Sequence, residues 1–378
     1  MTIVHLTPHL PPDQAANALL PYQLGEWAAA RGDTVRYVAH PPRAGASAPL
    51  PGDVTWIPRT RSTVWQKAAR LGSLSSAMRI WRDVSPLIAR ADIIHIHSNG
   101  LLAEIGALAA ARLGKPYVLT LYGTEIWHYE PRRPIDLFTR AYRGAAAVVF
   151  YSERLLLRAR EIALGRPDCY VIYPPVASSF LFHDWVAQQE ERLRLGITAR
   201  HVIVNVKRLH PLAGQRFLIE AMGEVVREHP DARLVICGAG DLLRELQHVA
   251  RAAGVERHVM FAGLVDNTMV ARYCAAADLF ALPSLLEALP TVAVEALACG
   301  TPVISSDNPG GLELNDVFGR DVQIVPRENA LALADAIRAR LREKRRTRET
   351  TAEIIARRFR ADAVARQYWE VYDAVRRK

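Results

Sequence analysis

The chain has 378 residues, of which 50% are hydrophobic and 23% charged, and its formal net charge is +9. This length exceeds what one hydrophobic core fills, so two domains are expected, and the composition excludes a disordered chain. No stretch approaches the roughly 18 apolar residues that a membrane span needs, and the first residues do not resemble a signal peptide, so we expect a cytosolic protein. The positive charge favours anionic partners, namely nucleotides, acidic lipid surfaces or nucleic acid, without choosing among them.

The first half of the chain alternates short β-branched runs with amphipathic stretches. Strands are expected at 2–6, 34–39, 93–97, 117–121, 148–151 and 170–173, and helices at 14–30, 101–113, 135–143 and 154–164. Strict alternation of strand and helix indicates a parallel sheet that is covered on both faces.

The pattern becomes polar and irregular from 176 to about 200 and then resumes. Strands are expected at 201–206, 233–237, 258–261, 279–282, 303–305 and 322–324, and helices at 216–228, 242–253, 270–276, 290–299, 331–341 and within 351–378. We therefore predict an N-terminal Rossmann-like domain (1–180), a linker (181–200), a second Rossmann-like domain (201–355) and a C-terminal helix (356–378) that packs back on the first domain. Two such halves place the ligand in a cleft between them, at the carboxyl ends of both sheets.

The four cysteines lie far apart along the chain. They are Cys169, Cys237, Cys274 and Cys299, and three of them fall in apolar runs. Such residues behave as buried small hydrophobic side chains in a reducing compartment. The spacing suggests neither a disulfide framework nor a zinc site.

The segment 284–303 combines two carboxylates with the start of a short helix. Pro290 suits a first helical position and Gly300 caps the end, so Glu295 falls inside an otherwise apolar helix and Glu287 just before it. A buried carboxylate without a partner costs several kcal/mol, so Glu295 needs a ligand or hydrogen-bond donors. Free N–H groups at the helix start favour anions near Glu287. The segment therefore predicts a site for a polyhydroxylated, phosphorylated ligand.

Glu287-x7-Glu295, in its surrounding sequence SLLEALPTVAVEALACGTPV, closely resembles the signature of retaining glycosyltransferases of the family-4 type. Further segments match that family in order: 92–97, 119–125, 206–209, 235–240, 261–265 and 308–313. The resemblance covers essentially the whole chain. It implies an α/β fold of the GT-B class, with two facing Rossmann-like domains, an interdomain cleft and C-terminal helices that cross back to the first domain.

The resemblance also implies roles for individual residues. Glu295 would bind the ribose hydroxyls of a nucleotide, and Glu287 would lie near the transferred sugar. Arg208 would stabilise the diphosphate as charge grows on it, which requires a fixed cation. The remaining donor contacts would come from Lys207, Gly263, Val265 and the backbone at Leu289, Pro290 and Thr291. The family reacts on one face of the sugar and needs no metal or other cofactor.

Three positions depart from the family pattern. Ala213 replaces a lysine, Tyr122 replaces a histidine, and Ala15-Ala16 replace a glycine pair near the phosphate. If the enzyme is active, the missing charge would come from Lys207, Arg216 or His210, although Lys207 and Arg216 also fit ordinary solvated surface. The departures support an alternative, a non-catalytic GT-B subunit that binds a nucleotide sugar or a partner enzyme. Nucleic-acid binding lacks any recognition motif.

The acceptor or sugar side is expected in the first domain. Its predicted residues are Asp13, His97, Tyr122, Gly123 and Glu125. For His97 two interpretations stay open: it opens into the cleft, or it is bonded within the loop framework. The donor nucleotide, UDP or GDP, stays open. The acceptor also stays open among a glycan, a lipid-linked sugar and a small metabolite.

A basic segment with tryptophans extends over 59–70 and 79–82. It includes Trp65 and Trp81 and has no acidic residue before Asp83. This composition suits peripheral docking on an anionic membrane that carries a lipid-linked acceptor. A solvated helix whose tryptophans pack on the core is the alternative.

Overall fold

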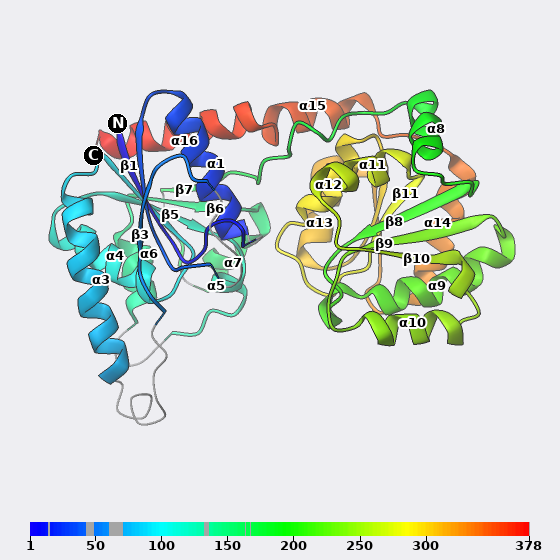
Figure 1. Cartoon of the computed structure of the whole chain (residues 1–378), viewed down its shortest axis with the longest axis horizontal. Coiled ribbons are helices and arrows are strands. Elements are labelled where there is room, and N and C mark those ends of the chain that lie inside the picture. Colours follow the sequence, from blue (N-terminus) through cyan, green and yellow to red (C-terminus); the bar gives the residue numbers. More distant parts are fainter. Residues whose placement is uncertain are drawn as a thin grey trace. The chain divides into compact units, whose positions relative to one another are not determined.

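The computed structural model describes residues 1–13, 16–42, 49–59, 71–131, 136–162, 164–166 and 168–377. The chain forms two compact units (Figure 1). Unit 1 comprises Met1–Pro174 and Val364–Lys378, and unit 2 comprises Pro175–Ala363. Each unit is a parallel sheet with helices, so the predicted pair of Rossmann-like domains is confirmed.

Unit 1 contains a seven-stranded parallel sheet in the order β3-β2-β1-β4-β5-β6-β7. Its strands are β1 (Thr2–Thr7), β2 (Thr34–Ala39), β3 (Asp53–Trp56), β4 (Ile93–His97), β5 (Tyr117–Leu121), β6 (Ala147–Phe150) and β7 (Cys169–Val171). Its helices are α1 (Ala16–Ala30), α3 (Leu71–Ala89), α4 (Leu101–Arg112), α5 (Thr124–Trp127), α6 (Leu137–Gly144), α7 (Glu153–Glu161) and α16 (Ala361–Arg376). The direction of strand succession reverses between β1 and β4, which makes this pair the switch point of the sheet.

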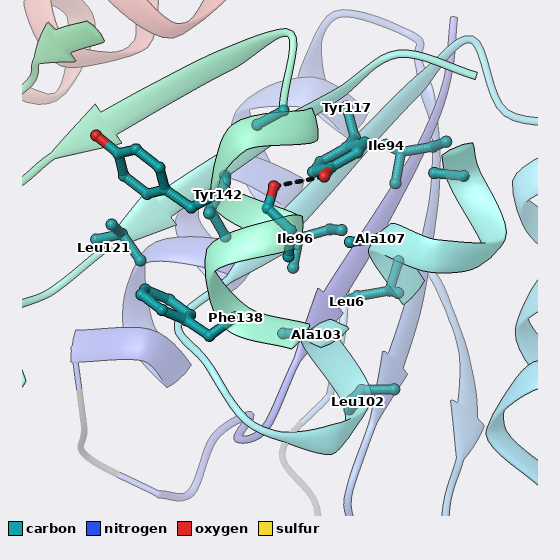
Figure 2. Close-up of a cluster of buried hydrophobic side chains, with 14 of the residues drawn as sticks. Leu6, Ile94, Ile96, Leu102, Ala103, Ala107, Tyr117, Leu121, Phe138 and Tyr142 are labelled. Atoms are coloured by element: carbon teal, nitrogen blue, oxygen red, sulfur yellow. Dashed lines mark hydrogen bonds between the residues drawn. The ribbon is translucent and has the colours of Figure 1, made fainter. Parts of the chain in front are cut away.

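Alternation along the strands divides the core of unit 1 between the two sheet faces. Ile94 and Ile96 of β4 pack with Leu102 of α4 on one face, shown in Figure 2. On that face Tyr117 donates a hydrogen bond to the carbonyl of Ala141, which ties β5 to α6. The other face is covered by α1 and α16, and α16 contributes buried residues to that core: Val364, Tyr368, Val371, Tyr372 and Val375. The C-terminal helix therefore completes unit 1, as predicted.

Unit 2 contains a six-stranded parallel sheet in the order β10-β9-β8-β11-β12-β13. Its strands are β8 (His201–Val206), β9 (Ala232–Cys237), β10 (Val259–Gly263), β11 (Leu279–Leu282), β12 (Val303–Ser306) and β13 (Val322–Val325). Its helices are α8 (Trp185–Arg194), α9 (Gln215–Glu228), α10 (Leu243–Ala252), α11 (Asn267–Ala276), α12 (Thr291–Ala298), α13 (Pro309–Phe318), α14 (Ala330–Glu343) and α15 (Glu349–Arg358), with 3-10 turns at Pro211–Ala213, Glu256–His258 and Gly319–Asp321. Here the switch point lies between β8 and β11.

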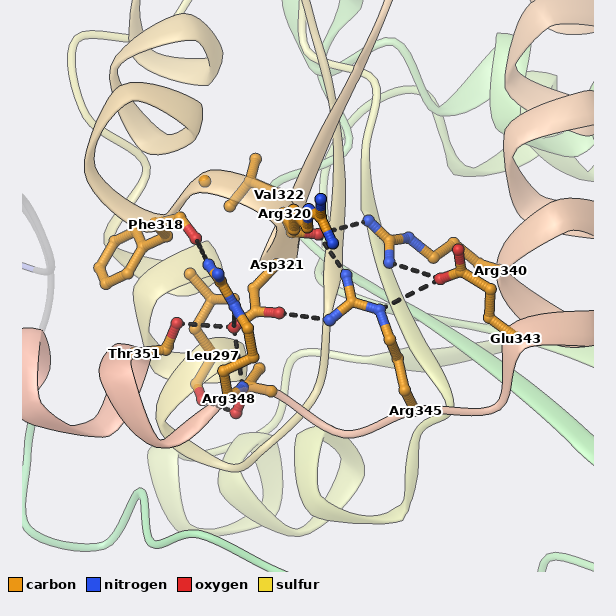
Figure 3. A network of polar contacts seen from close by, with 12 residues as sticks. Leu297, Phe318, Arg320, Asp321, Val322, Arg340, Glu343, Arg345, Arg348 and Thr351 are labelled. Atoms are coloured by element: carbon orange, nitrogen blue, oxygen red, sulfur yellow. Dashed lines mark hydrogen bonds and ion pairs between the residues drawn. The ribbon is translucent and has the colours of Figure 1, made fainter.

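A buried carboxylate fastens the segment between α14 and α15 to the sheet of unit 2 (Figure 3). Asp321 has no exposed surface and accepts hydrogen bonds from Arg345, from Thr351 and from the backbone of Arg348. Burial opposes its ionisation, but these hydrogen bonds outweigh burial and lower the pKa of Asp321. The charge is thereby paired inside unit 2, where it holds α15 in place.

Several elements differ from the sequence prediction. The stretch expected to be an irregular linker contains α8, because Asp184 caps its first turn by accepting from the backbone N–H groups of Val186 and Ala187. The chain also forms β3, α5 and α13 where no element was predicted, and α3 where a helix was one of two interpretations of the basic segment. All four cysteines are free, and Cys237, Cys274 and Cys299 are buried. In the described part of the chain no helix has the length and apolarity required to cross a membrane.

The basic segment can be followed only in part. Trp81 lies on α3 and packs against the core of unit 1, as the alternative of a core-packed tryptophan requires. Trp65, with the rest of 60–70, lies outside the described residues, and so does Ala15. The interdomain cleft also remains a prediction, because each unit is described by itself.

Candidate functional site

The loops that leave β8 and β11 meet at the switch point of unit 2. The backbone N–H of Leu285 donates to the carbonyl of Leu212 at 2.8 Å. Gly214 has φ +66°, and a Cβ atom there would lie 2.1 Å from the carbonyl oxygen of Pro283. Only glycine fits this crossing, so the two loops are held side by side at the carboxyl edge of the sheet.

A second glycine positions the residues that follow β8. Lys207 N donates to Cys237 O at 3.0 Å, and Gly238 N donates to Gly263 O at 2.7 Å. Gly238 has φ +148°, and a Cβ atom there would lie only 2.0 Å from the carbonyl oxygen of Lys207. These contacts bring Lys207, Arg208 and Gly263 to one edge, although their positions in the sequence span more than fifty residues. Val265 follows two residues after Gly263 and is half-buried.

The charged side chains at this edge differ in how they are paired. Lys207 forms an ion pair with Glu287 across the switch point. Arg208 is exposed, and among the described residues its guanidinium has no carboxylate partner. The site therefore offers one free cation and one cation that is shared with the first glutamate of the signature.

The start of α12 presents backbone donors beside this pair. Pro290 occupies the N-cap position and provides no side-chain cap, so the first N–H groups of the helix are open. The expectation that the backbone of Leu289, Pro290 and Thr291 would donate is corrected at Pro290, because proline has no N–H. An uncapped helix N-terminus carries partial positive charge and favours an anion.

The loop that carries Glu287 is fixed by the start of α13. Gly310 N donates to Glu287 O at 3.0 Å, and Asn308 Nδ2 donates to Ser284 O at 2.8 Å. Asn308 also caps α13 by accepting from Gly311 N. Asn308 lies in one of the segments that match the family, but no role was predicted for it. Its position one residue before Pro309 is the usual signal of a helix start and could have identified it.

Glu295 lies one turn into α12 and is half-buried. No ion pair or hydrogen bond satisfies its carboxylate among the described residues, and burial raises its pKa to about 7. A ligand that donates hydrogen bonds to this group would favour its ionised form. Glu295 is therefore available for the hydroxyl groups that the signature implies.

Lys207, Arg216 and His210 are the candidates to supply the charge of the family lysine that Ala213 replaces. Ala213 itself is buried. Arg216 pairs with Glu220 within α9, and His210 Nδ1 accepts from Leu212 N and so caps the adjoining turn. Lys207 is the one of the three whose charge contacts a signature glutamate.

Unit 1 has the corresponding switch point between β1 and β4, where three histidines gather. His5, His95 and His97 have no exposed surface. His5 Nδ1 lies 3.0 Å from His97 Nε2, and His95 Nδ1 lies 2.7 Å from the hydroxyl of Tyr372 on α16. Burial lowers the pKa of all three, to about 3 for His5, so the rings are neutral near pH 7.

His5, His95 and His97 are possible metal ligands. Their spacing in the sequence did not predict that they group together, because His5 lies on β1 and the other two lie on β4. Among the described residues, the three histidines form the one set of His, Cys, Asp or Glu ligand atoms within 4.8 Å of one another. Hydrogen bonds already engage both nitrogens of His95 and His97. We assign the set a framework role.

The predicted acceptor-side residues are mostly engaged within unit 1. His97 Nδ1 lies 2.7 Å from the hydroxyl of Tyr122, which corresponds to the interpretation of a histidine bonded within the framework. Glu125 is buried and accepts from Ser98 Oγ and from Gly123 N at 2.8 Å, so its carboxylate holds the turn. Asp13 pairs with His9 at 2.7 Å. Their contact with an acceptor remains a prediction.

Comparison with family models matches both halves of the chain. Residues 187–358 match the model described as glycosyl transferases group 1, and residues 21–180 match the model described as glycosyltransferase family 4. The Bacillus subtilis putative teichuronic acid biosynthesis glycosyltransferase TuaC is 30% identical over 292 residues, which cover 76% of this chain and 68% of the relative. The D-inositol 3-phosphate glycosyltransferase of Xylanimonas cellulosilytica is 32% identical, with coverage of 74% and 71%.

Two further comparisons are with a mannosyltransferase sequence and with a solved crystal structure. The GDP-mannose-dependent alpha-(1-6)-phosphatidylinositol monomannoside mannosyltransferase of Mycolicibacterium smegmatis is 32% identical and covers 63% of this chain and 66% of the relative. The crystal structure of Anabaena Alr3699/HepE in complex with UDP superposes with a TM-score of 0.77 at 19% identity and covers 99% of this chain and 100% of that chain. At that identity the likeness shows the fold, which is GT-B.

Proposed function

Because this chain belongs to the GT-B glycosyltransferases of the family-4 type, we propose that it moves a sugar from a UDP- or GDP-linked donor to an acceptor hydroxyl with retention of configuration. The observation that carries the proposal is the open, charged edge at the switch point of unit 2. There Arg208, in the loop after β8, lies at the same sheet edge as α12, which begins without a side-chain cap and carries Glu295; among the described residues neither charged side chain has a charged partner.

Each group suits one part of a nucleotide sugar. Arg208 and the start of α12 would hold the diphosphate and stabilise the charge that develops as the sugar–phosphate bond breaks. Glu295 would accept hydrogen bonds from the ribose hydroxyls, and Gly263 with Val265 would border the base. Glu287 would contact the transferred sugar.

Lys207 would take the role of the family lysine that Ala213 replaces. In the structure its ammonium is paired with Glu287. A diphosphate would compete for this cation, and Glu287 would then be free to accept hydrogen bonds from the sugar. The pair thus supports a donor site in which the same lysine balances charge before and after binding.

The acceptor is proposed only as a class. The relatives' names refer to different acceptors, among them phosphatidylinositol monomannoside and 2-deoxystreptamine. We therefore keep a glycan, a lipid-linked sugar and a small metabolite as the acceptor classes to be tested.

The test is a thermal-shift panel of UDP- and GDP-linked sugars, followed by an assay of donor hydrolysis. We expect one nucleotide family to raise the melting temperature, with slow release of free sugar whose anomeric form matches that of the donor. Absence of binding by every donor would contradict the proposal. Binding without hydrolysis or transfer would instead favour a non-catalytic subunit, the alternative suggested by Ala213.

A further inference from the structure

Helix α8 of unit 2 buries polar side chains and exposes three apolar ones. The face that packs on the unit is polar: Gln188 Nε2 donates to Ala277 O at 2.7 Å, and Arg192 Nε donates to Ala276 O at 2.8 Å. Arg192 also pairs with Asp278 at 2.7 Å. A surface helix normally buries its apolar stripe and exposes its charges. Here polar anchors hold the helix, and its exposed positions are shared between apolar residues (Trp185, Val186, Leu193) and polar ones (Gln189, Glu190, Arg194).

The outer face of α8 and the residues before it form an apolar ridge. Its members, with their exposed fractions, are Leu181 (57%), Phe182 (52%), Trp185 (42%), Val186 (69%) and Leu193 (80%). Scattered exposed apolar residues need no explanation, but five within thirteen residues mark an interaction surface. Leu193 and Val186 protrude from the helix, whereas the apolar contacts of a peptide-binding site lie in recessed pockets.

A recess with unpaired cations adjoins the ridge. Its cavity of about 620 Å³ is bordered by Trp185, Leu193, Arg200 and Lys344, among others. Arg200 and Lys344 have no carboxylate partner within the described ranges, whereas Asp278, which also borders the recess, is paired with Arg192. The neighbouring acids are engaged too, since Asp184 caps α8 and Glu190 pairs with Arg194. The two free charges in the recess are therefore positive.

We propose that unit 2 docks through this ridge on an anionic phospholipid bilayer, with Trp185 and Leu193 in the headgroup–acyl boundary and a lipid phosphate between Arg200 and Lys344. Aromatic and apolar side chains flanked by cations are the pattern that binds such interfaces. A second copy of the chain is a poorer occupant, because its net charge of +9 would bring like charges together. The ridge shares no residue with the basic segment 59–70 and 79–82, and the proposal goes beyond the transfer reaction.

The test is flotation of the full-length protein with vesicles of phosphatidylcholine containing phosphatidylglycerol. Val186→Glu combined with Leu193→Glu should lower the bound fraction at least tenfold, because two charges would enter the apolar boundary. Arg200→Gln combined with Lys344→Asn should lower binding about fivefold per cation removed and reduce its dependence on salt. Both variants should retain the melting temperature of the parent, since all four side chains are exposed.

Matched controls are available in the same unit. Leu331→Glu introduces a charge at another exposed leucine, and Arg227→Gln removes a cation from the surface of α9. Both control variants should bind vesicles as the parent does. Equal loss in the controls, equal binding to pure phosphatidylcholine, or no binding to any vesicle would overturn the proposal. A dimer in solution that Leu193→Glu abolishes would also overturn it and identify a second copy as the occupant.

Discussion

The two switch points of this molecule share an architecture and differ in how their polar groups are satisfied. In unit 2, Arg208 and Glu295 have no charged partner among the described residues, and α12 begins without a side-chain cap. In unit 1, His95, His97 and Glu125 are buried, and hydrogen bonds inside the unit engage them.

This difference shows that strand order alone does not make a ligand site. A parallel sheet brings the loops of both units together in the same way, but among the described residues the buried polar groups of unit 1 named above are hydrogen-bonded, whereas Arg208 and Glu295 of unit 2 have no charged partner. Unsatisfied groups gain free energy from a ligand, whereas satisfied ones must first give up internal hydrogen bonds. The predictions below separate a recognition role in unit 2 from a framework role in unit 1.

The largest effect is expected for Arg208→Ala. Removal of the free guanidinium should lower kcat about 10²- to 10³-fold, which is the loss typical for one preorganised charge at a developing anion. Steady-state kinetics with the donor identified by the thermal-shift panel measure the change. Arg227→Ala, at the far end of α9, is the control and should leave kcat unaltered. An Arg208 variant as active as the parent would remove this residue from the mechanism.

Glu295→Gln should weaken donor binding about 10- to 100-fold, because a charged acceptor is replaced by a neutral one. The parent should also bind donor about tenfold more tightly at pH 8 than at pH 6, since Glu295 ionises with a pKa of about 7 and only the ionised form accepts from both ribose hydroxyls. Calorimetric titration of both proteins across this range measures the effect. Persistence of the full pH dependence in the glutamine variant would argue against the ribose assignment.

Lys207→Ala should weaken donor binding about tenfold, the usual contribution of one charge-assisted hydrogen bond. Arg216→Ala is the matched comparison, because Arg216 was an equal alternative in the sequence and pairs with Glu220 in the structure. It should leave affinity within twofold of the parent. If Arg216→Ala weakened donor binding and Lys207→Ala did not, Arg216 and not Lys207 would supply the missing charge.

The smallest effect on donor affinity is expected in unit 1. His97→Gln should change donor affinity less than twofold and should instead alter acid stability. Buried histidines with lowered pKa bind fewer protons when folded than when unfolded, so the free energy of unfolding falls as pH drops below the ordinary value of 6.5, by about 1.4 kcal/mol per pH unit for each histidine. Urea unfolding at pH 5 and 7 should show a shallower dependence in the variant.

Much of the fold was predictable because parallel strands buried on both faces have a distinctive pattern. The strand 93–97 matches the observed β4, in which Ile94 and Ile96 pack in the core of one sheet face and Ile93 in the core of the other. The helix predicted at 290–299 is observed as Thr291–Ala298, since Pro290 and Gly300 determine its ends. By contrast, α8 was missed because its buried face is polar, which is the opposite of the periodicity that identifies surface helices.

The residues of the candidate site were predictable by type but not by their pairing. The signature indicated Glu287 and Glu295, yet nothing in the sequence distinguishes Lys207, which contacts Glu287, from Arg216, which pairs with Glu220 within its own helix. Similarly, the grouping of His5 with His97 depends on the pairing of β1 with β4. Contacts between distant strands arise from tertiary packing, and a pattern along one segment does not encode them.

The return of α16 to unit 1 has a consequence for biosynthesis. Tyr368 and Tyr372 belong to the core of unit 1, but the ribosome adds them after the whole of unit 2. A nascent chain can therefore complete unit 2, which is continuous in sequence, while the sheet of unit 1 still lacks one of its covering helices. During this interval the sheet face of unit 1 that α16 later covers would expose apolar surface, which favours aggregation until α16 docks.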